Sequence, residues 1–394
     1  MPLSFDRPPE PASMPMIDLF DDGHCSLLYP IHLVEGVAQI RVGTFTQQER
    51  WARVEQDLLA QGWNGGVLRV NARWIPDAET ANRILSQDLS RGANWNGLSL
   101  IRPGESVHAA SPIPEFKGTP RFIGHANDLF MGLEDQIQRD LEWMTTAWSL
   151  RALEAEGPAD IYGPKERIWV SEDATIRAAS LDTTRGVIVV GPGARVEPGS
   201  HIEGPVVLCE EAVVRTGAHI RGATVIGPHC KVGGEVSNVH FQGWANKAHG
   251  GFLGNSVIGR WCNLGAGTNS SNLKNTYGNV RQWSMASQDM EDSGLQFCGV
   301  LMGDHSKCGI GTTLNTGTIL GPACVLYDAG FPPKHLPAFS WHDARLGQTE
   351  RHDLPRMLAT AETVMARRGQ ALTQAAKDNL SALHADAMAN GASN

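Results

Sequence analysis

A six-residue repeat of aliphatic side chains over residues 190–232 constrains this chain more than any other feature. The aliphatic positions are Val190, Val196, Ile202, Leu208, Val214, Ile220, Ile226 and Val232. Four positions after each stands a small or β-branched residue: Ala194, Ser200, Val206, Ala212, Ala218, Thr224, Cys230 and Val236. An α-helix has a period of 3.6 residues and a single strand a period of two, so neither produces this pattern. The repeat predicts a β-solenoid whose coils have three short flat sides.

The same repeat resumes twice further along the chain. The repeat resumes at Phe252, Ile258 and Leu264, and then at Met302, Cys308, Leu314, Leu320 and Leu326. Val170 and Ile176 are expected to begin the first coil. At about 18 residues per coil, residues 170–327 would hold roughly eight or nine coils. Each buried Val or Ile contributes roughly 1.5–3 kcal/mol. A repeat of this length therefore outweighs local propensities.

The flanking regions have different compositions. Residues 16–153 alternate short aliphatic runs with a predicted helix over 46–59, which favours an α/β layer. After residue 331 a helical stripe runs to Gly369, and Thr373 is positioned to cap a second helix. We expect an α/β domain over 1–155, a linker over 156–167, a β-helix over 168–335 and a helical tail over 336–394. The tail is expected to pack on the last coil, or on a neighbouring subunit, and so to cover the strand edges at the solenoid end.

Charge and cysteine usage exclude several classes of protein. With 33 basic and 42 acidic residues, the net charge of −9 argues against binding along a nucleic-acid backbone. No apolar stretch approaches the ~18 residues of a membrane span, and the N-terminus does not resemble a secretory signal. The seven cysteines have no C-x-x-C spacing, so we expect reduced thiols in a cytoplasmic protein and neither a disulfide framework nor a zinc site.

The repeat breaks between Val232 and Phe252, and such interruptions are where function is expected. This segment contains His249, and Asn263 and Asn272 follow it. Imidazole suits general base catalysis because its pKa lies near neutrality. The glycines of Gly265-Ala266-Gly267 favour a tight corner over a phosphate loop, because no helix follows them.

The order of His249, Phe252, Asn263, the run Leu264-Gly265-Ala266-Gly267-Thr268 and Asn272 resembles a known enzyme family. It is the acetyltransferase half of the bifunctional N-acetylglucosamine-1-phosphate uridylyltransferase/glucosamine-1-phosphate N-acetyltransferases. The chain is most similar to shorter members with sugar nucleotidyltransferase-like N-terminal domains. Further shared segments are Leu19-Phe20-Asp21-Asp22, Ala38-Gln39-Ile40-Arg41-Val42-Gly43, Asn127-Asp128-Leu129-Phe130, Lys247-Ala248-His249 and Phe331-Pro332-Pro333-Lys334.

The resemblance implies that His249 takes a proton from a sugar amine as the amine attacks acetyl-CoA. It also implies that Asn263 and Asn272 bind the sugar or orient the base, and that Arg215 holds the sugar phosphate. Phe252 replaces the family's tyrosine, and Ser237 replaces a phosphate-binding lysine, for which Lys247 or Lys274 are the candidate substitutes. On the residues alone, Arg215 fits a solvated outer face equally well. The resemblance further implies a left-handed β-helix and a homotrimer with acetyl-CoA in the groove between neighbouring copies.

The N-terminal domain lacks a feature of active sugar nucleotidyltransferases. Those enzymes follow their first strand with a glycine turn, L-x-A-G-x-G-T-R-M, whereas this chain has Asp21-Asp22-Gly23-His24-Cys25. Asp22, Arg41 and Asn71 are the candidates for a nucleotide and Mg²⁺ site; the alternative is a scaffold that has lost nucleotidyl transfer. We therefore expect N-acetyl transfer from acetyl-CoA to an amino sugar phosphate or a nucleotide-linked amino sugar, either alone or together with sugar-1-phosphate nucleotidyl transfer. The alternatives are a nucleotidyltransferase whose β-helix only oligomerises it, and a non-catalytic sugar-nucleotide scaffold.

Overall fold

The structure, a computed structural model, describes residues 16–64, 66–89, 91–102, 112–153, 159–327 and 329–391. The described chain forms two compact units. The first unit contains residues 16–23 and 47–122, and the second contains residues 24–46 and 123–391. No helix among these residues is long and apolar enough to cross a membrane.

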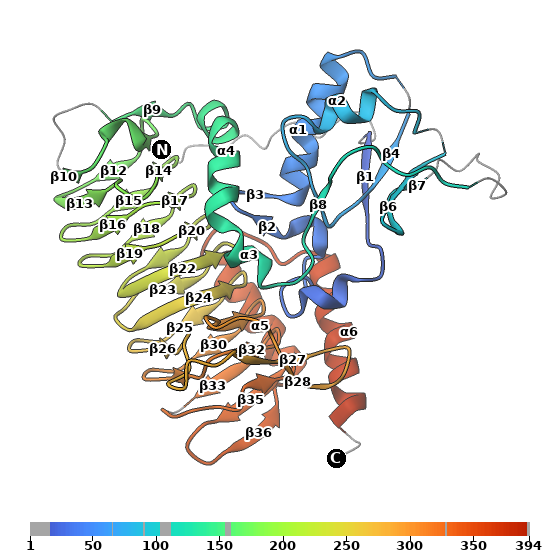
Figure 1. The fold of residues 1–394 in the computed structure, drawn as a ribbon. Coiled ribbons are helices and arrows are strands. Elements are labelled where there is room, and N and C mark those ends of the chain that lie inside the picture. The colour runs from blue at the N-terminus through green and yellow to red at the C-terminus, as the bar shows by residue number, and fades with distance from the viewer. Residues whose placement is uncertain are drawn as a thin grey trace. The chain divides into compact units, whose positions relative to one another are not determined.

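The first unit is a small α/β layer. Its sheet has the order β1 (Ile17–Phe20), β4 (Leu68–Asn71), β7 (Leu98–Arg102), β6 (Ala93–Trp95), in which β1 and β4 are parallel. Its remaining elements are α1 (Gln47–Ala60), α2 (Thr80–Leu85) and the paired strands β5 (Trp74–Ile75) and β8 (Arg121–Phe122). The predicted helix is confirmed, because Trp51, Val54 and Leu58 are buried on one side of α1 in the core of this unit. Figure 1 shows α1 and α2 beside the strands of this sheet.

The second unit is built around a parallel β-helix of about ten turns (Figure 1). One side is a sheet of β12 (Thr175–Ile176), β15 (Arg195–Val196), β18 (Val213–Val214), β21 (Lys231–Val232), β23 (Asn246–Lys247), β25 (Asn263–Leu264), β30 (Lys307–Cys308), β33 (Val325–Tyr327), β35 (Ser340–Asp343) and antiparallel β36 (Gln348–Arg351). We call it the ten-stranded face.

A second sheet forms the other sides of the β-helix. Its strands are β9 (Arg151–Ala152), β10 (Ala159–Tyr162), β11 (Ile168–Val170), β13 (Ala179–Asp182), β14 (Ile188–Val190), β16 (His201–Glu203), β17 (Val206–Leu208), β19 (His219–Arg221), β20 (Thr224–Ile226), β22 (Glu235–Phe241), β24 (Phe252–Ile258), β29 (Val300–Met302), β32 (Thr318–Leu320) and β34 (His335–Leu336).

The shorter elements of the second unit lie around these coils. They are β2 (Arg41–Val42), β3 (Phe45–Thr46), β26 (Asn269–Ser270), β31 (Thr313–Leu314), β27 (Arg281–Ser284), β28 (Asp289–Asp292), α3 (Asp128–Met131), α4 (Leu133–Ala147) and the 3-10 turns Cys25–Leu28, Val37–Gln39 and Lys165–Arg167. The hairpin β27–β28 projects from the longer interruption of the repeat that precedes Met302.

The predicted repeat positions form the interior of the coils. All eight aliphatic positions from Val190 to Val232, and the eight small positions that accompany them, are at most 1% exposed. Val190 pairs with Leu208 and Leu208 with Ile226, which gives the expected spacing of one coil per 18 residues. The fold class predicted from the sequence, an α/β domain followed by a parallel β-helix and a helical tail, is confirmed.

The predicted register is wrong at one position of the interruption. Leu253 pairs with the inward Val236 and is fully buried, whereas Phe252 pairs with Glu235 and is only half-buried. The coil between Val232 and its register partner Lys247 is shorter than 18 residues, and this shift moves the inward position from residue 252 to 253. Phe252 therefore presents its ring outside the coil interior.

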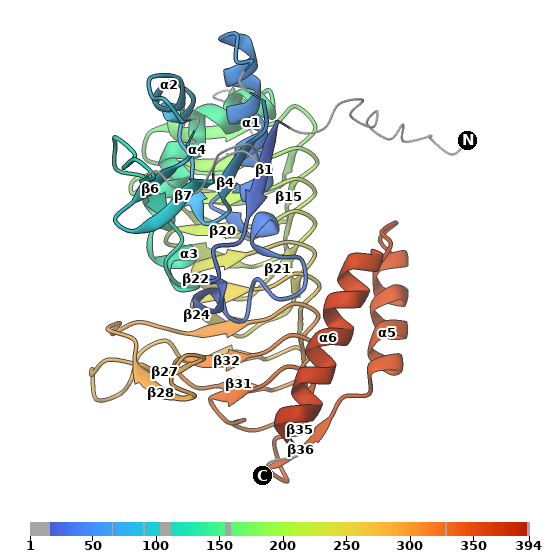
Figure 2. The same cartoon turned by 90° about the vertical axis from the view of Figure 1, so that its right-hand side faces the viewer.

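Two helices follow the last strands: α5 (Leu354–Ala366) and α6 (Gln374–Gly391). Asp353 caps α5 by accepting a hydrogen bond from the Arg356 amide, and the Thr373 hydroxyl accepts from the Ala376 amide at 3.1 Å. The tail packs on the last coils, as expected, through residues such as Ala323 and Phe339, but it does not cover the strand edges at the end of the β-helix (Figure 2). Both helices run along the side of the β-helix and do not close its end (Figure 2). Their apolar residues pack on corner residues of the coils, including Trp261 and Phe339.

That corner carries a column of stacked rings. His229, Trp244, Trp261 and His305 occupy equivalent positions in successive coils, and each has a positive φ between 57° and 62°. His229 stacks on Trp244 at 3.8 Å and Trp244 on Trp261 at 4.7 Å between ring centroids. The column provides a flat apolar surface for the tail helices.

All seven cysteines are free thiols, as expected, and six of them are buried. In several coils they take small or inward positions of the repeat, such as Cys230, Cys308 and Cys324. Burial raises the pKa of each of these three thiols to about 12. They serve as small apolar packing groups.

Candidate functional site

His249 lies in the shortened coil that interrupts the repeat, directly after β23, and is exposed. It lines an open groove of about 400 Å³ at the edge of the ten-stranded face. The other lining residues are Lys231, Asn246, Ala248, Asn263, Leu264, Gly265, Ala266 and Ile310. The structure thus brings two of the predicted residues, His249 and Asn263, to one groove.

The pleat of the ten-stranded face explains the amides in this groove. Asn246 and Asn263 pair in register on adjacent strands, and each directly precedes an inward residue. Successive side chains of a strand alternate between the two faces, so both amides project outward. Arg368, which follows α5, donates to the Asn246 side-chain oxygen at 3.0 Å and to the His229 carbonyl at 2.9 Å. The tail therefore fixes one of the amides at the groove.

Lys247 lies beneath His249, inside the coil. It is 1% exposed at the inward position that Val232 occupies in the preceding coil. Its ammonium donates to the carbonyl oxygens of Gly233 (2.9 Å), His249 (3.0 Å) and Gly251 (2.8 Å). An ammonium has three donors, and all three are used here. The expectation that Lys247 contacts a substrate phosphate is therefore wrong, and Lys247 instead anchors the backbone of the His249 loop.

Replacing Lys247 with methionine is expected to lower the free energy of unfolding by about 1–3 kcal/mol, because buried carbonyl oxygens lose their donor. The Gly251 oxygen keeps the Glu235 amide as a partner, so the Gly233 and His249 oxygens carry most of the effect. Lys231→Met is the matched control, since Lys231 is exposed one coil away. Equal unfolding midpoints in urea for the two variants would contradict this role.

The protonation of Lys247 also makes the free energy of unfolding depend on pH. Burial lowers the pKa of Lys247 to about 8 from its ordinary 10.5. Between these values the folded chain has lost the proton while the unfolded chain still binds it, so rising pH stabilises the folded state. The unfolding free energy of the wild type is expected to rise relative to Lys247→Met as the pH increases from 8 to 10.5. A constant difference across this window would oppose the assignment.

Phe252 and Asn272 lie on the other side of the His249 corner. Both contact Gly254: a Cβ at this glycine would lie 2.6 Å from the Phe252 ring and 2.7 Å from the Asn272 side-chain nitrogen. Asn272 also donates to the Asn255 side-chain oxygen at 2.7 Å. Asn263 and Asn272 therefore belong to different faces of the coil, with the His249 corner between them.

The predicted cations are not in the groove. Arg215 precedes His249 by two coils and forms an exposed ion pair with Glu197 at 2.7 Å. Lys274 donates to the Asn279 carbonyl at 2.9 Å, before the β27–β28 hairpin. Lys231 is the cation that lines the groove, and the sequence analysis missed it. Its position directly before Val232, one coil ahead of Asn246, is the signal that identifies it.

In the first unit, Asp22 and Asn71 are close together, and the Asp22 carboxylate already accepts hydrogen bonds from Asn71 and Arg73. The Asp22 carboxylate accepts from Arg73 Nη2 at 2.5 Å and from Asn71 Nδ2 at 2.9 Å, and the Asp22 and Arg73 side chains are each 5% exposed. Arg41 belongs to the second unit, where its backbone amide donates to Gln242 Oε1 at 2.7 Å. A carboxylate paired in this way does not fit an Mg²⁺ ligand. No metal-binding group of three or more His, Cys, Asp or Glu was found in the described ranges.

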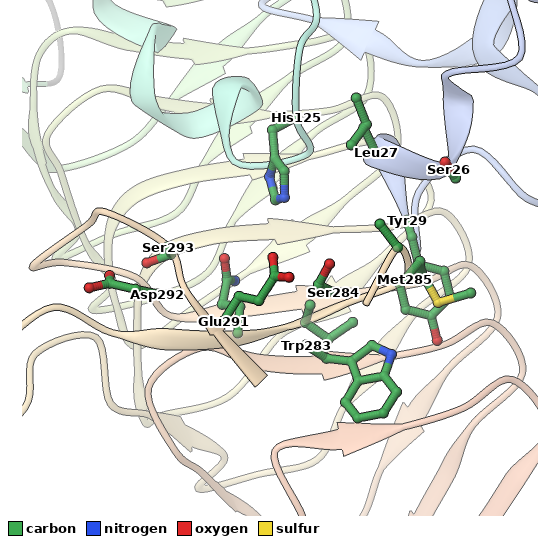
Figure 3. Close-up of a pocket in the computed structure, with 13 residues that line it drawn as sticks. Ser26, Leu27, Tyr29, His125, Trp283, Ser284, Met285, Glu291, Asp292 and Ser293 are labelled. Carbon is green, nitrogen blue, oxygen red and sulfur yellow. The ribbon is translucent and has the colours of Figure 1, made fainter. Parts of the chain in front are cut away.

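A further cavity, of about 130 Å³, lies between the β27–β28 hairpin, β32 and residues 26–29 (Figure 3). His125 points into it from one side, and Ser284 and Glu291 point into it from the other. Trp283 stacks on His335 at 4.3 Å, and Tyr29 Oη lies 3.1 Å from His335 Nε2. None of the predicted site residues lines this cavity. Its walls come from four separated chain segments, which no sequence motif connects.

Comparison with known proteins gave matches to parts of the chain. Residues 17–148 match a family model described as sugar nucleotidyl transferase. This supports the nucleotidyltransferase likeness of the N-terminal region, and the strands of the β-helix lie outside the match. No curated protein matches the chain.

Among solved structures the chain is similar to three transferases. The polySia specific acetyltransferase NeuO has 12% identity and a TM-score of 0.22, over 49% of this chain and 80% of that chain. An Arabidopsis UDP-N-acetylglucosamine acyltransferase has 13% identity and a TM-score of 0.23, over 55% of this chain and 80% of that chain. The Campylobacter jejuni UDP-N-acetylglucosamine acyltransferase has 14% identity and a TM-score of 0.21, over 54% of this chain and 81% of that chain. TM-scores this low support no inference about activity.

Proposed function

We propose that this protein is a transferase that moves the acetyl group of acetyl-CoA to the amine of an amino sugar phosphate or a nucleotide-linked amino sugar. The observation that carries the proposal is the exposed His249 in the same groove as the Asn263 amide, above a loop anchored by Lys247. His249 takes the proton from the attacking amine. Asn263, Asn246 and Lys231 are positioned to bind polar groups of the substrates.

The groove is open toward Ile310, which is 76% exposed. We propose that a neighbouring copy covers this side in a homotrimer, as the family resemblance implies, and that acetyl-CoA enters along the seam. An exposed isoleucine beside a functional groove is consistent with an interface. We place the protein in the cytoplasm, where its seven free thiols stay reduced.

The proposal is tested by following thiol release from acetyl-CoA in the presence of amino sugar 1-phosphates and nucleotide-linked amino sugars. We expect release that requires the acceptor and yields an N-acetylated sugar. Acceptor-independent hydrolysis, or no release with any acceptor, would contradict the proposal.

A second candidate is sugar-1-phosphate nucleotidyl transfer, which the match over residues 17–148 favours. Against it stand the missing glycine turn and the occupied Asp22 carboxylate. Mg²⁺-dependent pyrophosphate release from nucleoside triphosphates would support it. Saturable binding of nucleotide sugars with neither reaction would favour the third reading, a non-catalytic scaffold.

A further inference from the structure

A separate cavity of about 170 Å³ lies between the ten-stranded face and helix α5. Its polar lining consists of His305, Lys307, His352, Arg356 and Thr360. Val325, Trp341, Met357 and Ala361 supply the apolar part of the wall. The volume is below the ~300–1,000 Å³ of typical small-molecule pockets, so the cavity suits a small group.

The charge of this lining has one sign. Lys307 and Arg356 are cations, and no carboxylate lines the cavity among the described residues. The two nearest acids in sequence have other partners: Asp304 accepts from the Arg260 amide at 2.7 Å, and Asp353 accepts from the Arg356 amide at 3.0 Å. In a protein of net charge −9, this is a local excess of positive charge.

Lys307 is half-buried and Arg356 is exposed, so the cost of burying this positive charge falls mainly on Lys307. Burial lowers the pKa of Lys307. Burial is also the main cause that lowers the pKa of His352; the hydrogen bond with the Ala323 carbonyl and the charge of Asp353 raise this pKa, and the charges of Arg356 and Lys307 lower it further. Lys307 uses one of its three donors on the His305 carbonyl oxygen, at 3.1 Å. A buried cation without a paired acid is costly unless another anion compensates it.

His305 provides an independent observation. It is 3% exposed, and neither ring nitrogen has a hydrogen-bond partner. Buried polar groups are satisfied in most proteins, so an unpartnered imidazole in a cavity wall indicates a missing ligand or water. A neutral imidazole still has one N–H donor, and His305 lines the same cavity as Lys307 and Arg356.

We propose that this cavity binds a phosphate-sized oxyanion, held by Lys307, Arg356 and the N–H of His305. The oxyanion is either free inorganic phosphate or a phosphoryl group carried by a nucleotide. Tetrahedral oxyanions accept several charge-assisted hydrogen bonds at once, which matches three donors around a small cavity. The site is distinct from the His249 groove, because the two cavities share no lining residue.

The test measures the thermal unfolding midpoint of the full chain during titration with inorganic phosphate at constant ionic strength, with chloride as the balancing salt. Binding to the folded state raises the midpoint. Arg356→Gln removes one charged donor from an exposed position, so it should fold normally and raise the phosphate Kd about tenfold or more. Arg367→Gln is the matched control, since it removes an exposed charge just after the same helix but outside the cavity.

The proposal is overturned if phosphate stabilises the wild type no more than chloride does, or if the Arg356 and Arg367 variants respond alike. Lys307→Met provides a second variant, whose loss of response is read only where its circular dichroism matches the wild type. Adenosine monophosphate at equal concentration distinguishes the sources. A larger midpoint shift than with phosphate identifies a carried phosphoryl group, and an equal or smaller shift identifies free phosphate. Neither readout depends on acyl transfer, so the inference and the proposed function fail separately.

Discussion

Replacing His249 with glutamine is expected to lower the turnover of acyl transfer by about 100- to 10,000-fold, the range for losing a general base. Glutamine retains polarity and approximate size but cannot accept a proton near neutral pH. Because the His249 side chain is exposed, the variant should keep the unfolding midpoint of the wild type. The measurement is the initial rate of acceptor-dependent thiol release at saturating substrate.

The matched control is His219→Gln. His219 is also exposed on the β-helix and pairs with Glu235, but its ring contacts His201 edge to face and does not line the groove. We expect its turnover to stay within about twofold of the wild type, because a surface change outside the groove usually alters stability by less than about 0.5 kcal/mol and removes no group from the site. If both variants retain full turnover, or both lose it equally, His249 is not the base.

Replacing Asp22 with alanine is expected to destabilise the first unit by about 3–5 kcal/mol, because it leaves the buried Arg73 charge without its carboxylate. A carboxylate kept to bind Mg²⁺ would behave differently, since removing an uncompensated acid from a metal site commonly stabilises the fold. The measurement is amide hydrogen exchange in β1 and β4, which pair next to Asp22.

Asp18→Ala is the control for this substitution. Asp18 forms an ion pair with Arg69 at 3.0 Å in the same sheet, but its side chain is 49% exposed. Exposed pairs contribute about 0–1 kcal/mol, so exchange should change little. Unchanged or slower exchange in Asp22→Ala would contradict the structural role of Asp22 and would restore it as a metal-ligand candidate.

The β-helix could be predicted from the sequence because its core requires one aliphatic side chain at a fixed interval. That rule gave the buried positions from Val190 to Val232 without any tertiary information. It was wrong at Phe252, because a shortened coil moves the inward position by one residue and both Phe252 and Leu253 are apolar. The pattern contains no information about which of two adjacent apolar residues faces inward.

Lys247 was misassigned for a related reason. A lysine in an interrupted repeat indicates an exposed cation, whereas here three backbone carbonyls allow its ammonium to replace an aliphatic side chain in the core. The oxyanion cavity was also inaccessible to sequence analysis. Lys307 and Arg356 are brought together only because α5 packs along the side of the coils, and the sequence favoured packing at their end.

The central claim, that acyl transfer takes place at the His249 corner, is tested most directly by a crystal structure with CoA and an accepted amino sugar. We predict the substrate amine within about 2.6–3.2 Å of a His249 ring nitrogen, or one water away, with polar groups of the ligands on Asn263. A sugar bound instead in the cavity beside Trp283 and Glu291, with His249 contacting neither ligand, would contradict the account.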